Sequence, residues 1–283
     1  MNFSLNMIAL YTIIRKEIIR VLRIWIQTIL PPVITMSLYF IIFGSLIGSR
    51  IGKMGGYDYM QYIAPGLIMM SVITNSYGNV VSSFFGAKYG RHIEEMIISP
   101  MSSAIIIIGH VAGGVLRGLL VGMLVTIVAL GFTDLQVKYP LITFSIVLLT
   151  SVVFSLAGFI NALFAKDFDD IAIVPAFILA PLTYLGGVFY SIEMLPEFWR
   201  NFSMMNPLYW MINGLRYATL GIADTSHELS LGISIIFAIF FFLVYRFIDW
   251  FDEPRKIFLL GFLAILLSNS IQGIDNGLIY NTS

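Results

Sequence analysis

The stretch from Pro181 to Ile222, PLTYLGGVFYSIEMLPEFWRNFSMMNPLYWMINGLRYATLGI, decides how the rest of the chain is interpreted. It is too apolar for a surface loop, and prolines and glycines interrupt it too often for one transmembrane helix. It also carries four charged residues, Glu193, Glu197, Arg200 and Arg216. Inside a bilayer, broken backbone is tolerated only where protein or a water-filled cavity satisfies the freed polar groups. We therefore predict that this interrupted segment completes one membrane helix and continues as short re-entrant or interfacial helices.

Composition indicates a polytopic all-α membrane protein. The chain has 283 residues, of which 58% are hydrophobic and 11% are charged, whereas about a quarter of the residues in a soluble domain are charged. The net charge is zero, so no nucleic-acid partner is indicated. The absence of cysteine excludes disulfides and thiolate chemistry, and the histidines His92, His110 and His227 are far apart, so neither a metal site nor a cofactor is predicted. No cleavage site follows the first basic cluster, so no signal peptide is expected.

Apolar stretches predict six transmembrane helices. They cover residues 27–47, 62–85, 104–132, 140–165, 171–190 and 229–248, and the interrupted segment joins the last two. Pro31 and Pro32 fall in the first turn of the first span, where proline is tolerated. Before this span, residues 2–23 mix basic and apolar side chains at helical spacing. They predict either an amphipathic helix in the membrane interface or simply the basic flank of the first span.

The third predicted span contains Gly109, Gly113, Gly114, Gly118 and Gly122. Their spacing predicts one helix face of nearly bare backbone, which favours close helix packing over a substrate groove. The same span contains an arginine, Arg117. An intramembrane arginine marks either a functional pathway or a side chain that reaches back to the headgroups, and both readings stay open.

Basic residues predict that the N terminus is cytoplasmic. With six spans, the inside segments hold Arg15, Lys16, Arg20, Arg23, Lys88, Arg91, Lys166, Arg246, Arg255 and Lys256. The outside segments hold half as many, namely Arg50, Lys53, Lys138, Arg200 and Arg216. This bias agrees with the positive-inside rule.

The predicted cytoplasmic stretch Gly86–Ser103, hereafter the docking segment, is polar and then apolar, and it reads GAKYGRHIEEMIISPMSS. A short amphipathic helix of this kind can seat in a groove of a soluble partner. An ordinary charged loop is the alternative.

The sequence offers little chemistry of its own. The nearest approach to a phosphate loop, GSRIGKM at Gly48–Met54, is one residue short and lacks the Ser or Thr that binds magnesium. The predicted spans carry almost no coupling charges or carboxylate pairs, so energy for uphill transport must come from another chain. The alternatives are a channel or proton-coupled carrier, which could use only Asn75, His110 and Arg117, and a membrane-embedded lipid enzyme.

These features together resemble the permease subunit of ABC-2 type exporters, and most closely the YadH-like and nodulation-type permeases. The matching strings are Pro181–Tyr190, Leu195-Pro196-x-Phe198-Trp199, Asn206-Pro207-Leu208-Tyr209, Gly214-Leu215-Arg216-Tyr217 and Tyr89-Gly90-Arg91 to Ser99-Pro100. The resemblance covers about residues 1–248 and implies an ABC-2 transmembrane domain over 1–256. Residues 257–283 depart from the family pattern as an atypical tail. The apolar part of this tail, 257–273, predicts an interfacial or swapped helix, or alternatively a seventh span.

The resemblance implies a multi-pass protein of the cell inner membrane that works as a homodimer. Two copies of a separate ATP-binding subunit would hold the ATP and Mg²⁺, so this chain is not expected to be an enzyme. The docking segment would be the coupling helix, with Tyr89, Arg91, His92, Glu94 and Glu95 at the contact. The extracellular gate would use Tyr190, Leu195, Pro196, Trp199, Asn206, Pro207 and Arg216. Family cargoes include drugs, lipids, lipo-oligosaccharides and polysaccharides, and the sequence does not choose among them.

Overall fold

The computed structural model describes residues 3–99 and 101–252, and their regular secondary structure is helical apart from one short β-hairpin. The chain divides into two compact units, Met1–Phe241 and Phe242–Ser283. The sites discussed below lie in the first unit. The predictions for 257–273 and for the tail 257–283 lie outside the described residues.

The chain begins with three consecutive helices, α1 (Phe3–Arg23), α2 (Trp25–Thr28) and α3 (Leu30–Tyr39). The prolines of the predicted first span lie at the start of α3, as expected, because proline fits the first helical turn. The helix continues as a π-helical stretch, Phe40–Ile47, and a final turn, α4 (Gly48–Ile51). A hairpin of β1 (Lys53–Met54) and β2 (Tyr57–Asp58) follows, and Gly55 and Gly56 turn it with positive φ angles.

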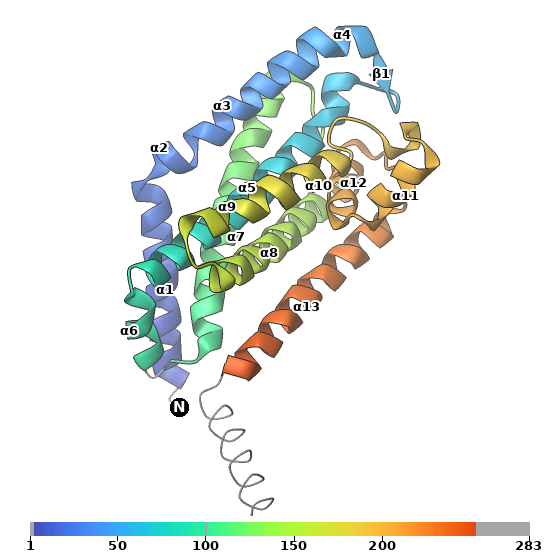
Figure 1. Ribbon diagram of the computed structural model, residues 1–283. Coiled ribbons are helices and arrows are strands. Elements are labelled where there is room, and N and C mark those ends of the chain that lie inside the picture. The colour runs from blue at the N-terminus through green and yellow to red at the C-terminus, as the bar shows by residue number, and fades with distance from the viewer. Residues whose placement is uncertain (1–2, 100, 253–283) are drawn as a thin grey trace, which may run out of the picture. The chain divides into compact units, whose positions relative to one another are not determined.

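Helix α5 (Tyr59–Tyr89) is the centre of the first unit, and α7 (Ser103–Phe132) and α8 (Pro140–Phe164) pack along it (Figure 1). Most residues of α5 are buried, including the polar side chains of Asn75, Ser76 and Asn79. The short helix α6 (His92–Ile98) lies between α5 and α7 in the chain. A helix that is buried on all sides can keep polar groups, since neighbouring helices rather than lipid receive them.

The interrupted segment consists of short helices, as predicted. The chain passes through α9 (Phe168–Val174), a π-helical stretch (Pro175–Leu179), α10 (Ala180–Leu185), a 3₁₀ turn (Ile192–Met194), α11 (Glu197–Met205), α12 (Pro207–Leu220) and α13 (His227–Asp252). The predicted fifth span, 171–190, extends five residues beyond the C-terminal end of the helix, Leu185. The helix stops at Leu185 because the following glycine pair turns the chain, with Gly187 at a φ of 76°.

Four helical stretches in the described part of the chain are long and apolar enough to cross a membrane. They are Trp25–Gly44, Ser103–Phe132, Pro140–Phe164 and Phe168–Leu185. The predicted second span falls on α5, which is too polar to belong to this set. The predicted sixth falls on α13, whose apolar part, Glu228–Val244, is shorter. The fold is therefore an all-α membrane architecture, and its central helix is covered by protein.

The glycines of α7 pack helices together, but the prediction of a single bare face was wrong. A Cβ at Gly109 or Gly113 would meet Ile13 or Glu17 of α1. A Cβ at Gly114 would instead meet Val80 of α5 and Ser155 of α8, and one at Gly118 would meet Ser76 and Ser151. Two glycine faces thus hold α7 against α1 on one side and against α5 and α8 on the other. They contact protein, and Gly122 also lines the groove described below.

Candidate docking helix and gate

The docking segment forms a charged helix on the surface of the first unit. The side chains of Arg91, His92, Glu94 and Glu95 are all exposed, and Tyr89, just before them, is 65% exposed. Arg91 precedes α6 with a φ of 59°, a left-handed conformation that turns the chain between α5 and α6. The helix forms as predicted, and it presents charges of both signs.

The end of α5 anchors this charged helix. Lys88 donates hydrogen bonds to the carbonyl oxygens of Leu163 and Ala165, at 2.6 and 2.7 Å, and so caps the end of α8. The ring of Tyr89 packs against Phe85 and Phe168, with centroids 6.0 and 4.9 Å away. The end of α5, from which α6 follows, is therefore in direct contact with α8 and α9.

The interrupted segment is centred on one buried arginine. Arg216 of α12 is 1% exposed, and its Nη2 donates to the carbonyl oxygen of Gly187 at 2.6 Å. Its guanidinium lies over the ring of Tyr62 of α5, 4.1 Å from the ring centroid. The carboxylate of Asp224 lies 4.0 Å from Nη1 and accepts a hydrogen bond from the backbone N–H of Ile192. The arginine thus ties the turn after α10 to α5 and α12.

Asn206 joins α10, α11 and α12. Its side chain accepts from the N–H of Leu208 at 3.0 Å, which caps α12, and donates to the carbonyl oxygen of Leu182 at 2.6 Å. Pro207 then occupies the first position of α12. The Asn-Pro pair is therefore a helix start that is fastened to α10.

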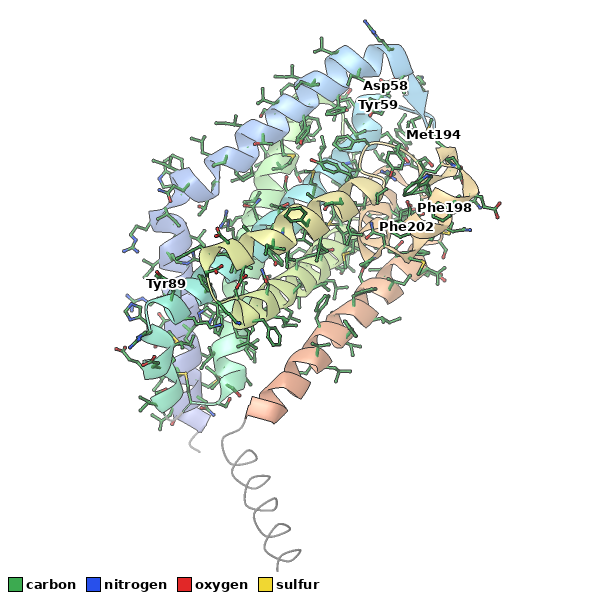
Figure 2. All side chains as sticks on the ribbon, in the orientation of Figure 1. Asp58, Tyr59, Tyr89, Met194, Phe198 and Phe202 are labelled. Carbon is green, nitrogen blue, oxygen red and sulfur yellow. The ribbon has the colours of Figure 1, made fainter. Side chains whose placement is uncertain are left out.

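The other predicted gate residues lie around this framework. Tyr190 and Leu195 are half-buried, whereas Pro196 and Trp199 are exposed. Burial raises the pKa of Tyr190, so its hydroxyl stays neutral at physiological pH. Helix α11 exposes the apolar side chains of Phe198, Trp199, Phe202 and Met205. In Figure 2, Met194, Phe198 and Phe202 lie at one end of the first unit, and Tyr89 lies at the opposite end.

The side chain of Arg117 turns into the helix bundle. Its Nη2 donates to Oδ1 of Asn75 at 2.9 Å and approaches the carbonyl oxygen of Thr28 at 3.4 Å. Two of the polar groups that a carrier could use, Arg117 and Asn75, are thus bonded to each other. The third, His110, is fully buried, and its Nδ1 lies 2.7 Å from the carbonyl oxygen of Ile106 in its own helix.

Sequence reasoning missed a buried carboxylate on α1 that is paired within α1 and hydrogen-bonded to α5. Glu17 is fully buried, accepts from the hydroxyl of Ser83, and pairs with Arg20 at 3.0 Å. Arg20 also donates to Oδ1 of Asn79 at 2.7 Å. A signal was present, since Glu17 lies four residues from both Ile13 and Val21 on the face that α1 buries. The apolar side chains of Ile8 and Tyr11 lie on the exposed face of α1.

Within the described residues, no group of three His, Cys, Asp or Glu side chains could hold a metal ion. The clustered polar groups instead hold helices together, on α1 and α5 at one end and around Arg216 at the other.

The model of the ABC-2 type transporter family matches residues 8–220. The chain belongs to the ABC-2 type transporter family. The match includes α6 and the interrupted segment up to the end of α12, and it lies within the predicted domain 1–256. The inner membrane transport permease YadH of Escherichia coli K12 is 56% identical over 237 residues, which are 84% of this chain and 93% of that protein. Nodulation protein J of Rhizobium leguminosarum bv. viciae is 24% identical over 245 residues, which are 85% of this chain and 92% of that protein.

The docking segment and the interrupted segment both lie within the residues that match the ABC-2 type transporter family. The family resemblance read from the interrupted segment and from Tyr89 to Pro100 is confirmed. Both regions are built on α5 and its neighbours.

Proposed function

We propose that this chain is the transmembrane subunit of an ATP-driven exporter of the inner membrane. Family membership and the likeness to an inner membrane transport permease support this proposal. Two copies form the substrate pathway, and each binds a separate ATP-binding subunit that carries ATP and Mg²⁺. The chain itself contributes no catalytic residue.

The observation that carries the proposal is the placement of α6. It is short, charged and exposed, and it follows directly from the central helix α5, whose end is fixed to α8 by Lys88. A nucleotide-binding subunit that grips α6 therefore moves the core of the bundle rather than a loose loop.

In this proposal the chain crosses the membrane six times with its N terminus in the cytoplasm. Helices α5 and α13 are the second and sixth spans, and α1 precedes the first. The polar residues of α5 are compatible with a span because α7, α8 and α12 cover them. The interrupted segment then lies at the outer face as re-entrant helices and closes the exit, with Arg216 holding it shut.

Co-purification tests the proposal. The tagged chain is expected to bring down an ATP-binding-cassette subunit in stoichiometric amount from solubilised native membranes. Replacing Arg91 and Glu94 by Ala is expected to lower the recovered subunit at least tenfold, because both side chains are exposed where a partner can bind them. Replacing the exposed Arg50 of α4 by Ala is the matched control and should change nothing. A chain that purifies alone and transports in liposomes without ATP would instead favour a channel or carrier.

A further inference from the structure

A groove of about 440 Å³ lies between α7, α8 and α12, near the ends of these helices that carry the 133–139 connection. Its wall includes Met123 and Ile127 of α7, Phe144 of α8 and Leu215 of α12. The first three side chains are between 55% and 58% exposed, so the groove opens on the outer surface of the bundle. Both α7 and α8 are apolar enough to cross the membrane, so this surface faces lipid.

The groove is lined mainly by hydrocarbon, because the hydroxyl groups of the threonines in its wall are already hydrogen-bonded to the backbone. Thr126, Thr143 and Thr219 line it, but each hydroxyl donates to a carbonyl oxygen of its own helix, at Gly122, Tyr139 and Leu215. These hydrogen bonds satisfy the hydroxyls and leave mainly hydrocarbon for an occupant. A hydrocarbon chain fits this wall, whereas a sugar or a peptide would lack hydrogen-bonding partners.

A lysine lies in the connection between α7 and α8, whose residues Leu135 and Val137 form part of the groove wall. Val137 and Pro140 line the groove, and Lys138 lies between them in the sequence. The backbone N–H groups of Lys138 and Tyr139 donate to the carbonyl oxygens of Thr219 and Ala218, which fixes this stretch along the end of α12. The backbone of Lys138 is therefore held by the fold beside residues of the groove wall.

The ammonium group of Lys138 is oriented by one hydrogen bond and has further N–H donors free to bind a ligand. It donates to the hydroxyl of Tyr57 at 2.9 Å, and that hydroxyl donates in turn to the carbonyl oxygen of Leu220. The stem of the lysine lies over Gly221, where a Cβ would meet it. An ammonium has three donors, and no carboxylate pairs with this one among the described residues. An anionic oxygen can therefore bind beside Tyr57.

We propose that this groove is a specific site for one anionic phospholipid, with an acyl chain between α7, α8 and α12 and the phosphate on Lys138. The exposed ring of Tyr139, stacked on Tyr217 at 5.2 Å, lies at the same end, where aromatic side chains mark the level of the headgroups. The site does not depend on the ATP-driven mechanism. In the orientation proposed above, it belongs to the outer leaflet.

Native mass spectrometry of the full chain in detergent tests the site. The probes are phosphatidylglycerol and phosphatidylcholine with identical acyl chains. We expect one phosphatidylglycerol per chain to bind about tenfold more tightly than phosphatidylcholine, as a charge-assisted hydrogen bond predicts. Lys138→Gln should remove this preference, and Arg50→Gln, another exposed cation, should keep it. An unchanged preference in Lys138→Gln would overturn the proposal.

Two further variants test the groove itself. Thr143→Phe and Met123→Phe each place a ring in the groove, so both should weaken the binding of both lipids. If both variants stay folded and bind lipid as before, the acyl chain lies elsewhere and the proposal is wrong. Because the chain has no cysteine, Phe144→Cys gives one reactive site at the groove mouth. Cross-linking of two chains through this cysteine would show that a second copy covers the groove, which would also overturn the lipid site.

Discussion

Glu17 is a fully buried carboxylate in a segment of otherwise basic and apolar residues. Arg20 neutralises it at 3.0 Å, while Lys16 is farther away at 3.8 Å and nearly half exposed. The hydroxyl of Ser83 and the amide of Asn79 complete the cluster on the α5 side. A buried ion pair adds little net stability, but its partners depend strongly on each other.

This dependence predicts the outcome of a double-mutant cycle. Arg20→Leu alone should lower the free energy of unfolding by about 3 kcal/mol, because it leaves the carboxylate buried without its main partner. The double variant Glu17→Leu/Arg20→Leu should recover most of that loss. Thermal and denaturant unfolding in detergent would measure both. If the two single losses simply add, the residues are not coupled and the cluster is not a unit.

At the scale of residues, the sequence singled out Arg216 and Arg117, but it did not indicate which residues contact them. Arg216 was recognised from its motif and is indeed central to its region. Its contacts with Tyr62, Gly187 and Asp224 could not be read from the sequence, because the fold brings these residues together from α5, the turn after α10 and the stretch after α12. For Arg117, the structure places Asn75 within hydrogen-bonding distance, a partner that the sequence did not indicate.

Helix α7 shows how small residues work at the scale of an element. Its glycines at 109 and 113 face α1, while those at 114, 118 and 122 face α5 and α8. A helix turns about 100° per residue, so positions 113 and 114 cannot share one face. The sequence spacing showed that close packing occurs, but the division into two interfaces required the neighbouring helices.

Alanine substitutions on α7 separate packing from helix propensity. A Cβ at Gly114 would lie 2.9 Å from the carbonyl oxygen of Ser76 and would also collide with Val80 and Ser155. Gly114→Ala should therefore lower the unfolding free energy by about 1–3 kcal/mol. Gly131→Ala on the same helix is the control, because nothing lies within 4 Å of its Cβ position, and it should be neutral or stabilising. Equal melting temperatures for the two variants would contradict this account.

At the scale of the molecule, the docking helix and the interrupted segment belong to opposite ends of the first unit, and α5 runs between them (Figures 1 and 2). One end of α5 leads into α6. Near the other end, Tyr62 contacts Arg216, and Gly66 packs against the backbone of Val188. A rigid helix between two sites is a direct physical connection, and this is the arrangement that the proposed mechanism needs.

Cysteine labelling tests whether α5 crosses the membrane. The chain has no cysteine, so Lys53→Cys and Glu95→Cys each give one exposed reactive site, on either side of α5. In right-side-out vesicles, a membrane-impermeant maleimide should label residue 53 and not residue 95, and inverted vesicles should give the reverse. Labelling of both sites from the same side would rule out the proposed crossing.

The sequence by itself determined that this is a helical membrane protein of the ABC-2 type family with a broken segment near its end. Hydrophobicity, helix breakers and motif strings are local properties, so they can be read along the chain. The tertiary structure alone decided that α5 is the shared core, that Glu17 is buried, and that Arg216 holds the interrupted segment together. These outcomes depend on side chains that are distant in sequence and meet only when helices pack, since buried polar groups must find partners wherever the fold provides them.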